Sequence, residues 1–97
     1  MKVTFVWPAE LEIDEAIRFY EIQQEGLGRR FYGELRSAIA RILEFPSAWT
    51  RVGPNSRRCL LKRFPYAILF AVRKDEVLIL AVAHQHRDPT HYAHRLI

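Results

Sequence analysis

The stretch Arg57–Gln85, RRCLLKRFPYAILFAVRKDEVLILAVAHQ, holds the longest apolar runs of the chain. Runs of this length and composition, bounded by charged and turn-forming residues, are typical of β-strands. They predict three strands, at about Arg57–Phe64, Tyr66–Arg73 and Glu76–Gln85. Lys74-Asp75 leaves room only for a tight turn between the last two strands. The stretch is therefore predicted to fold as an antiparallel meander.

The residues before this stretch predict one further strand and two helices. Lys2–Trp7 alternates like a strand, and the apolar spacing that follows predicts a helix over about Pro8–Glu25. Gly26–Gly28 interrupts the helical pattern, and a second helix is expected over about Leu27–Phe45. Because the connection is short, we expect the two helices to pack as an antiparallel hairpin.

The predicted elements define the fold class. With Ser47–Ser56 as a loop and 86–97 as a short basic tail, the expected order is β-α-α-β-β-β. This order predicts an α+β fold in which a helical hairpin packs on one face of a four-stranded, mainly antiparallel sheet. The length of 97 residues predicts one domain over residues 1–97.

The last two predicted strands are apolar on both faces, whereas two helices can cover only one. Strict alternation places one set of large apolar residues on the face away from the helices: Leu69, Leu78, Leu80 and Val82. The tail, a second copy or a partner chain must cover that face. We expect a partner, with these four residues as its contacts.

Composition excludes several classes of protein. The 49% hydrophobic and 27% charged residues are typical of a globular domain. The two longest apolar runs, Ala67–Val72 and Val77–Ala83, are far shorter than the roughly 18 residues that a membrane-spanning helix needs. Only a few apolar residues precede Pro8, so we expect no secretory signal. Cys59 is the only cysteine, which excludes an internal disulfide. We expect a cytoplasmic protein without contact with a membrane.

Charge is distributed unevenly along the chain. Residues 1–48 carry 6 basic and 8 acidic side chains, a net charge of −2, whereas residues 49–97 carry 9 basic and 3 acidic ones, a net charge of +6. The basic residues that could gather at one rim of the sheet are Arg57, Arg58, Lys62, Arg63, Arg87 and Arg95. Guanidinium groups bind phosphates and carboxylates well, so the second half is expected to meet an anionic partner.

The four histidines are the other candidates for chemistry. His84 and His86 would share one face of a strand, but only Asp88 nearby could add a metal ligand. We therefore expect neither a metal nor a cofactor. His86 or His91 has an intrinsic pKa suited to a general base, provided that a substrate lies within reach.

The sequence resembles the RelE/ParE superfamily, the small toxins of bacterial type II toxin–antitoxin pairs. The resemblance lies in A-x16-GLGxRF over Ala9–Phe31, a helix ending at Phe45-Pro46, and the motifs RRCLLKRFPYAILFAV and VLILAVAHQHRDP. It covers nearly the whole chain and implies a strand, two helices and an antiparallel meander. It also implies a cognate antitoxin that binds and neutralises the toxin.

The superfamily has two branches with different targets. RelE-like toxins cleave messenger RNA in the ribosome, and their members usually carry an arginine after the aromatic residue that opens the third strand. Here that position is Ala67, after Tyr66. A methyl group cannot stabilise charge on a scissile phosphate, so the resemblance favours the ParE-like branch, whose members inhibit DNA gyrase.

The resemblance implies different residues for each function. For a gyrase inhibitor without a catalytic site of its own, we expect target contacts from Arg58, Arg63, Arg87 and Arg95. For a ribosome-dependent endoribonuclease, the alternative, His86, Arg87 and Tyr92 would move the protons. A second alternative is a degenerate, non-toxic module that only binds an antitoxin.

Overall fold

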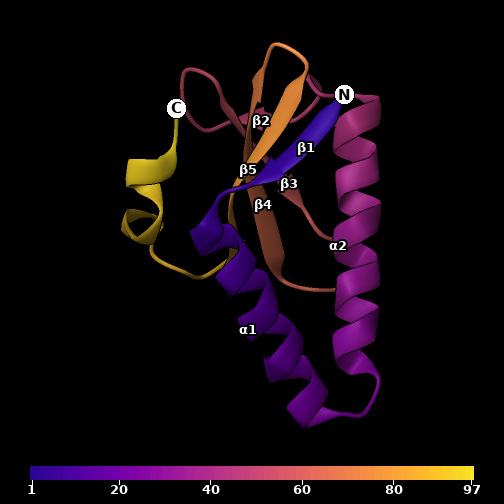
Figure 1. The fold of residues 1–97 in the computed structure, drawn as a ribbon. Coiled ribbons are helices and arrows are strands. Elements are labelled where there is room, and N and C mark those ends of the chain that lie inside the picture. Colours follow the sequence, from indigo (N-terminus) through magenta and orange to yellow (C-terminus); the bar gives the residue numbers. More distant parts are fainter.

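The computed structural model describes residues 1–97 and has the predicted order of helices and main strands. Its elements are β1 (Lys2–Phe5), α1 (Trp7–Gln23), α2 (Leu27–Glu44), β2 (Thr50–Arg51), β3 (Ser56–Leu60), β4 (Tyr66–Arg73) and β5 (Glu76–His84), followed by two short 3-10 turns, Pro89–His91 and Ala93–Arg95. The α+β class and the helical hairpin are confirmed (Figure 1).

The sheet has five strands rather than the predicted four, in the order β1-β5-β4-β3-β2. β1 pairs parallel to β5, and every other pair is antiparallel. The additional strand, β2, lies inside the predicted loop Ser47–Ser56 and pairs with Arg57 and Arg58 of β3. Two residues are too few to display an alternating pattern, so this strand could not be predicted from periodicity.

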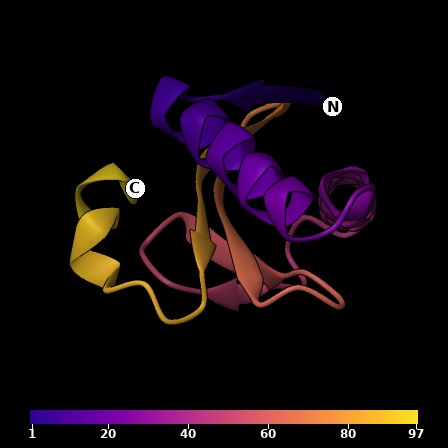
Figure 2. The same ribbon diagram turned by 90° about the horizontal axis from the view of Figure 1, so that it is seen from below.

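Both helices pack on the same face of the sheet and enclose the main core. That core combines apolar positions of α1, α2, β3, β4 and β5. At its centre four rings meet, with Phe31 lying 5.4 Å from Tyr20, 5.3 Å from Phe64 and 5.1 Å from Tyr66 between ring centroids. Figure 2 shows the hairpin on one side of the sheet and the C-terminal tail on the side away from α2. Neither helix combines the length and apolar character needed to cross a bilayer.

A bulge in β5 reverses the predicted facing of its second half. Leu69 pairs with Ala81 and Phe70 with Ile79, so Leu80 is an extra residue without a partner in β4. One extra residue moves every later side chain to the other face. The prediction that Leu78, Leu80 and Val82 share a face is therefore wrong, because Val82 packs in the helix-side core.

The face away from the helices is covered by the chain's own tail. Tyr92 and Leu96 pack against a small cluster formed by Ala67, Leu69, Ala81 and Ala83. The end of the tail is held as well, since the Ser56 hydroxyl donates to the Ile97 carbonyl and accepts from its amide. The expectation of an open apolar face is thus wrong. Leu69, Leu80 and Val82 are at most 2% exposed, and of the predicted antitoxin contacts only Leu78 keeps appreciable surface.

The turn between the helices depends on two glycines and one carboxylate. Gly26 has a φ of 86°, in the left-handed region that favours glycine. The Glu21 carboxylate accepts hydrogen bonds from the amides of Gly26 and Gly28, at 2.9 and 3.0 Å. These two bonds lower the pKa of Glu21 and satisfy amides at the start of α2. Gly28 also brings α2 close to α1, because a Cβ there would lie 2.7 Å from the Ile17 carbonyl oxygen.

We expect Gly28→Ala to lower the free energy of unfolding by about 1–2 kcal/mol. The steric cost of about 1–3 kcal/mol for overpacking outweighs the gain of up to about 1 kcal/mol from helix propensity. Gly33→Ala is the matched control, since a Cβ at Gly33 in α2 meets nothing within 4 Å and should stabilise the protein. Urea unfolding of both variants measures the difference, and equal stabilisation by both would contradict the close contact at Gly28.

Candidate functional site

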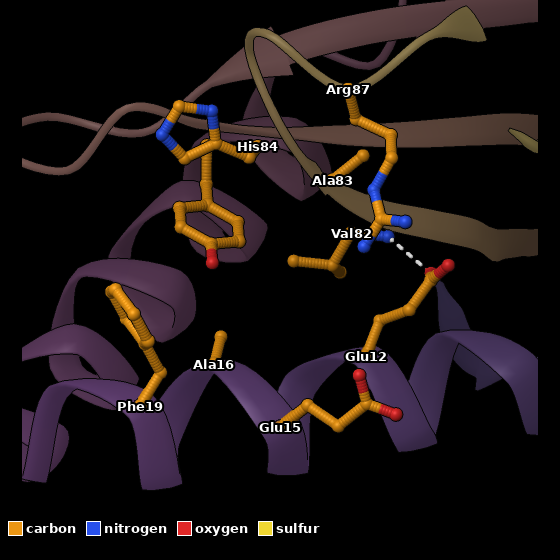
Figure 3. A pocket seen from close by; sticks show the side chains of 9 residues that line it. Glu12, Glu15, Ala16, Phe19, Val82, Ala83, His84 and Arg87 are labelled. Carbon is orange, nitrogen blue, oxygen red and sulfur yellow. Dashed lines mark hydrogen bonds between the residues drawn. The ribbon is translucent and has the colours of Figure 1, made fainter. Parts of the chain in front are cut away.

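The candidate site is a cavity of about 240 Å³ between α1 and the end of β5. Its lining residues come from α1, from the first residue of β4, from the end of β5 and from the turn after it. They are Glu12, Glu15, Ala16, Phe19, Tyr66, Val82, Ala83, His84 and Arg87. Figure 3 shows Phe19 and Glu15 on the helix side and His84 and Arg87 on the strand side. The cavity is mixed in character, with an aromatic end and a charged end.

The cavity exists because β1 is shorter than its neighbour β5. β1 pairs with β5 only as far as Phe5 opposite Ile79, whereas β5 continues to His84. Beyond Ile79 that edge of β5 has no partner strand, and its backbone groups need other partners. The Glu12 carboxylate supplies one by accepting a hydrogen bond from the Val82 amide at 3.0 Å, drawn as the dashed line in Figure 3.

Glu12 also holds the C-terminal tail, and we call this group of contacts the tail clamp: Glu12, His91, Arg95 and the backbone of Leu80 and Val82. The Arg95 guanidinium donates two hydrogen bonds to the Glu12 carboxylate, at 3.0 and 2.9 Å, and a third to the Leu80 carbonyl at 2.9 Å. The His91 ring lies 3.2 Å from the same carboxylate. Glu12 thus joins α1, the open edge of β5 and the tail.

Opposing effects set the pKa of Glu12. Burial by itself would raise the pKa, because the charged form loses water. Hydrogen bonds from Arg95 and the Val82 amide, the positive charge of Arg95 and the contact with His91 outweigh burial and lower the pKa. The carboxylate is therefore charged at neutral pH. No local spacing in the sequence predicts this role for Glu12, because its partner Arg95 lies 83 residues further along the chain.

The aromatic end of the cavity joins Tyr66 and His84, neither of which was predicted as a site residue. Tyr66 opens β4 directly opposite His84 at the end of β5, and their rings lie 5.4 Å apart. The His84 Nδ1 accepts a hydrogen bond from the His86 amide at 3.1 Å, which leaves Nε2 to carry the proton of the neutral ring. Burial raises the pKa of Tyr66, partly offset by Arg87, so the phenol is protonated at neutral pH.

The basic residues that were predicted to gather at one rim of the sheet do not form a single surface. Arg58 is exposed on β3 and, like its register partner Leu69, belongs to the face away from the helices. Arg63 is 73% exposed and pairs with Glu34 of α2 at 3.0 Å, on the helix side. Arg87 lies at the cavity. Arg95 is only 11% exposed in the tail clamp, so the prediction that it contacts a target is wrong for the folded chain.

The structure also separates the three residues of the nuclease alternative. His86 and Arg87 are exposed in the turn after β5. Tyr92 belongs to the tail and packs against the cluster that contains Ala81 and Ala83, on the face opposite the helices. Sequence reasoning missed Tyr66 and His84, although antiparallel pairing of β4 with β5 could have found them. The first residue of one strand of a hairpin lies beside the last residue of the next.

The fold and the tail define a class of small α+β proteins with a helical hairpin on a mixed sheet. A chain of the solved structure described as "Chromosomal ParDE TA system from P. aeruginosa" has this fold, with a TM-score of 0.72, 17% sequence identity, and coverage of 87% of this chain and 95% of that chain. The family described as "ParE toxin of type II toxin-antitoxin system, parDE" matches residues 3–89. This chain belongs to the ParE toxin family. No curated protein matches it.

Proposed function

We propose that this ParE-family toxin inhibits DNA gyrase and is neutralised by a cognate antitoxin. The observation that carries the choice of target is the environment of Ala67. Its side chain is 5% exposed and lies beneath Tyr92 and Leu96 of the tail. A RelE-like ribonuclease would be expected to place a phosphate-stabilising cation there, and this position offers a buried methyl group.

The tail supports the same choice of target. Tyr92 covers an apolar cluster and Arg95 is held by Glu12, so both residues stabilise the fold. Of the four arginines predicted as target contacts, the exposed ones are consequently Arg58, Arg63 and Arg87, on different parts of the surface. Exposed guanidinium groups mainly speed and orient association with an acidic partner, and no step at a scissile bond is needed for that role.

The toxin is expected to stop DNA synthesis before protein synthesis when it is induced in bacteria without an antitoxin. Pulse-labelling of both processes in parallel, together with a reporter of DNA damage, measures the order. With purified gyrase, the protein should inhibit supercoiling and increase cleaved plasmid DNA. Early loss of protein synthesis with position-specific cleavage of messenger RNA would overturn the proposal in favour of the endoribonuclease. Continued growth with a folded protein would favour the non-toxic module.

Substitution of the exposed arginines tests the proposed contacts. We expect Arg58→Glu, Arg63→Asn and Arg87→Glu each to weaken inhibition of supercoiling, by about tenfold where the contact contributes about 1.4 kcal/mol. Asparagine is chosen at Arg63 because its φ of 68° suits few residues. Arg73→Glu, at the far end of β4, is the matched exposed control. Unchanged inhibition in all three variants would reject this surface.

The antitoxin part of the proposal rests on the family match and not on the four residues first considered. Three of those residues, Leu69, Leu80 and Val82, are at most 2% exposed in the folded chain. Co-expression with the candidate antitoxin encoded beside the toxin should restore growth and yield a complex that survives gel filtration. Growth arrest that persists despite soluble candidate antitoxin, with no complex formed, would reject that pairing.

A further inference from the structure

Helix α1 has two apolar sides, and only one of them is used by the fold. Ala9, Ile13, Ala16 and Tyr20 are buried in the core. On the outer side lie four large apolar side chains that we call the α1 stripe: Trp7, Leu11, Phe19 and Ile22. They are 68%, 39%, 55% and 86% exposed. At 100° per residue these positions lie within about a third of the helix circumference.

Single exposed apolar residues are ordinary on a protein surface, but the α1 stripe places four of them on one helix. Large apolar side chains gain free energy when they leave water, so four of them along one side of a single helix mark an interaction surface. Figure 2 shows α1 crossing over the sheet with its outer side uncovered. Phe19 also lines the cavity, which makes the cavity continuous with the α1 stripe (Figure 3). An anchoring side chain of a partner could therefore enter beside Phe19.

The charges around the α1 stripe are mostly negative. One flank carries Glu10, Asp14 and Glu21, spaced so that they follow the same side of the helix, and Glu15 lies within the stripe. Arg18 is the only cation on this side. Four carboxylates and one guanidinium give a local net charge of −3 in a chain whose net charge is +4.

These charges discriminate between the possible occupants. If a second copy packed antiparallel so that Trp7 met Ile22, Asp14 of one copy would face Glu15 of the other at the centre of the interface. Like charges opposed in that way disfavour the pairing. A helix with an apolar stripe flanked by lysine or arginine would instead cover the apolar residues and pair with the carboxylates.

We propose that the outer side of α1, together with the adjoining cavity, docks a basic amphipathic helix of a partner protein. The apolar side of the partner helix covers the α1 stripe, and its cationic flanks meet Glu10, Asp14 and Glu15. Of the proposed gyrase contacts, Arg58 and Arg63 lie outside this surface, whereas Arg87 lines the adjoining cavity. The docking does not depend on which target the toxin has.

The test uses Trp7 as a reporter on the full chain carrying Trp49→Phe, which leaves Trp7 as the only tryptophan. The probes are an 18-residue amphipathic peptide with a leucine stripe and lysine flanks, the same peptide with glutamate flanks, and a scrambled form of the first. We expect the lysine peptide to shift Trp7 emission to shorter wavelength and to bind at least about tenfold more tightly than the other two, equivalent to about 1.4 kcal/mol. The net charge of +4 would by itself favour the glutamate peptide. Tighter binding of the lysine peptide must therefore arise from the carboxylates beside the α1 stripe.

Surface variants locate the binding site. Leu11→Ser and Ile22→Ser should each weaken the lysine peptide at least about tenfold, whereas Leu60→Ser, an exposed apolar position on β3, should not change it. Equal or tighter binding of the glutamate peptide, or an equal effect of Leu60→Ser, would overturn the proposal. So would sedimentation showing a dimer that Ile22→Ser dissociates, because the occupant would then be a second copy.

Discussion

Glu12→Ala is expected to free the C-terminal tail and lower the free energy of unfolding by about 3 kcal/mol. Glu12 accepts from Arg95 twice and from the Val82 amide, and both charged side chains are about nine-tenths buried. Removing one partner of a buried ion pair costs about 3–5 kcal/mol, since the other charge stays buried without compensation. We place the effect at the lower end, because Arg95 retains the Leu80 carbonyl as a partner.

The consequences of this change should be local as well as global. Amide hydrogen exchange of Val82 should become faster, and a dye that binds apolar surface should detect the face containing Ala81 and Ala83 once Tyr92 no longer covers it. Glu15→Ala, one turn along on the exposed surface, is the control and should change stability by less than about 0.5 kcal/mol. A Glu12→Ala protein as stable as this control would refute the tail clamp.

The tail clamp also predicts how stability depends on pH. The pKa of Glu12 is lower in the folded chain than the ordinary glutamate value of about 4.3. Its contribution is therefore present above that value and is lost as the pH falls through the lowered pKa. The difference in unfolding free energy between the wild type and Glu12→Gln should shrink as the pH falls below the ordinary glutamate value and the carboxylate takes up a proton. A difference independent of pH down to the acid limit of folding would contradict the charged state of Glu12.

Phe31→Ala is expected to lower the free energy of unfolding by about 4 kcal/mol, within the range of about 3–5 kcal/mol for deleting a buried phenylalanine. Phe31 is fully buried, and its ring touches those of Tyr20, Phe64 and Tyr66. Removing it leaves a cavity between α1, α2 and β4. It also loosens Tyr66, which forms the aromatic end of the cavity near His84.

The neighbouring residue Tyr32 provides the control for Phe31. Tyr32 lies on the same helix with a similar side chain but is 46% exposed. Denaturant unfolding of Tyr32→Ala should show a loss below about 1 kcal/mol, so the difference between the two variants isolates the aromatic cluster. Losses of equal size would mean that helix α2 is destabilised as a whole and that the cluster adds little.

The amino-acid pattern alone determined the two helices, the four longer strands and their order, because periodicity reports which sides of a segment are apolar. The apolar spacing on either side of Gly26 predicted the helical hairpin, and the apolar runs on either side of Lys74-Asp75 predicted the antiparallel meander. The resemblance to the RelE/ParE superfamily placed Ala67 where RelE-like ribonucleases usually carry an arginine. It also supported the family, which the match over residues 3–89 establishes.

Only the tertiary structure decided which residues remain available at the surface. Alternation assumes a constant register, and the extra residue Leu80 breaks it, so Val82 faces the helices. The pairing of Glu12 with Arg95 joins positions 83 residues apart, and no local spacing encodes such a contact. The sequence thus determined what kind of fold this chain adopts, whereas packing of the tail determined which of its arginines and apolar residues a partner can reach.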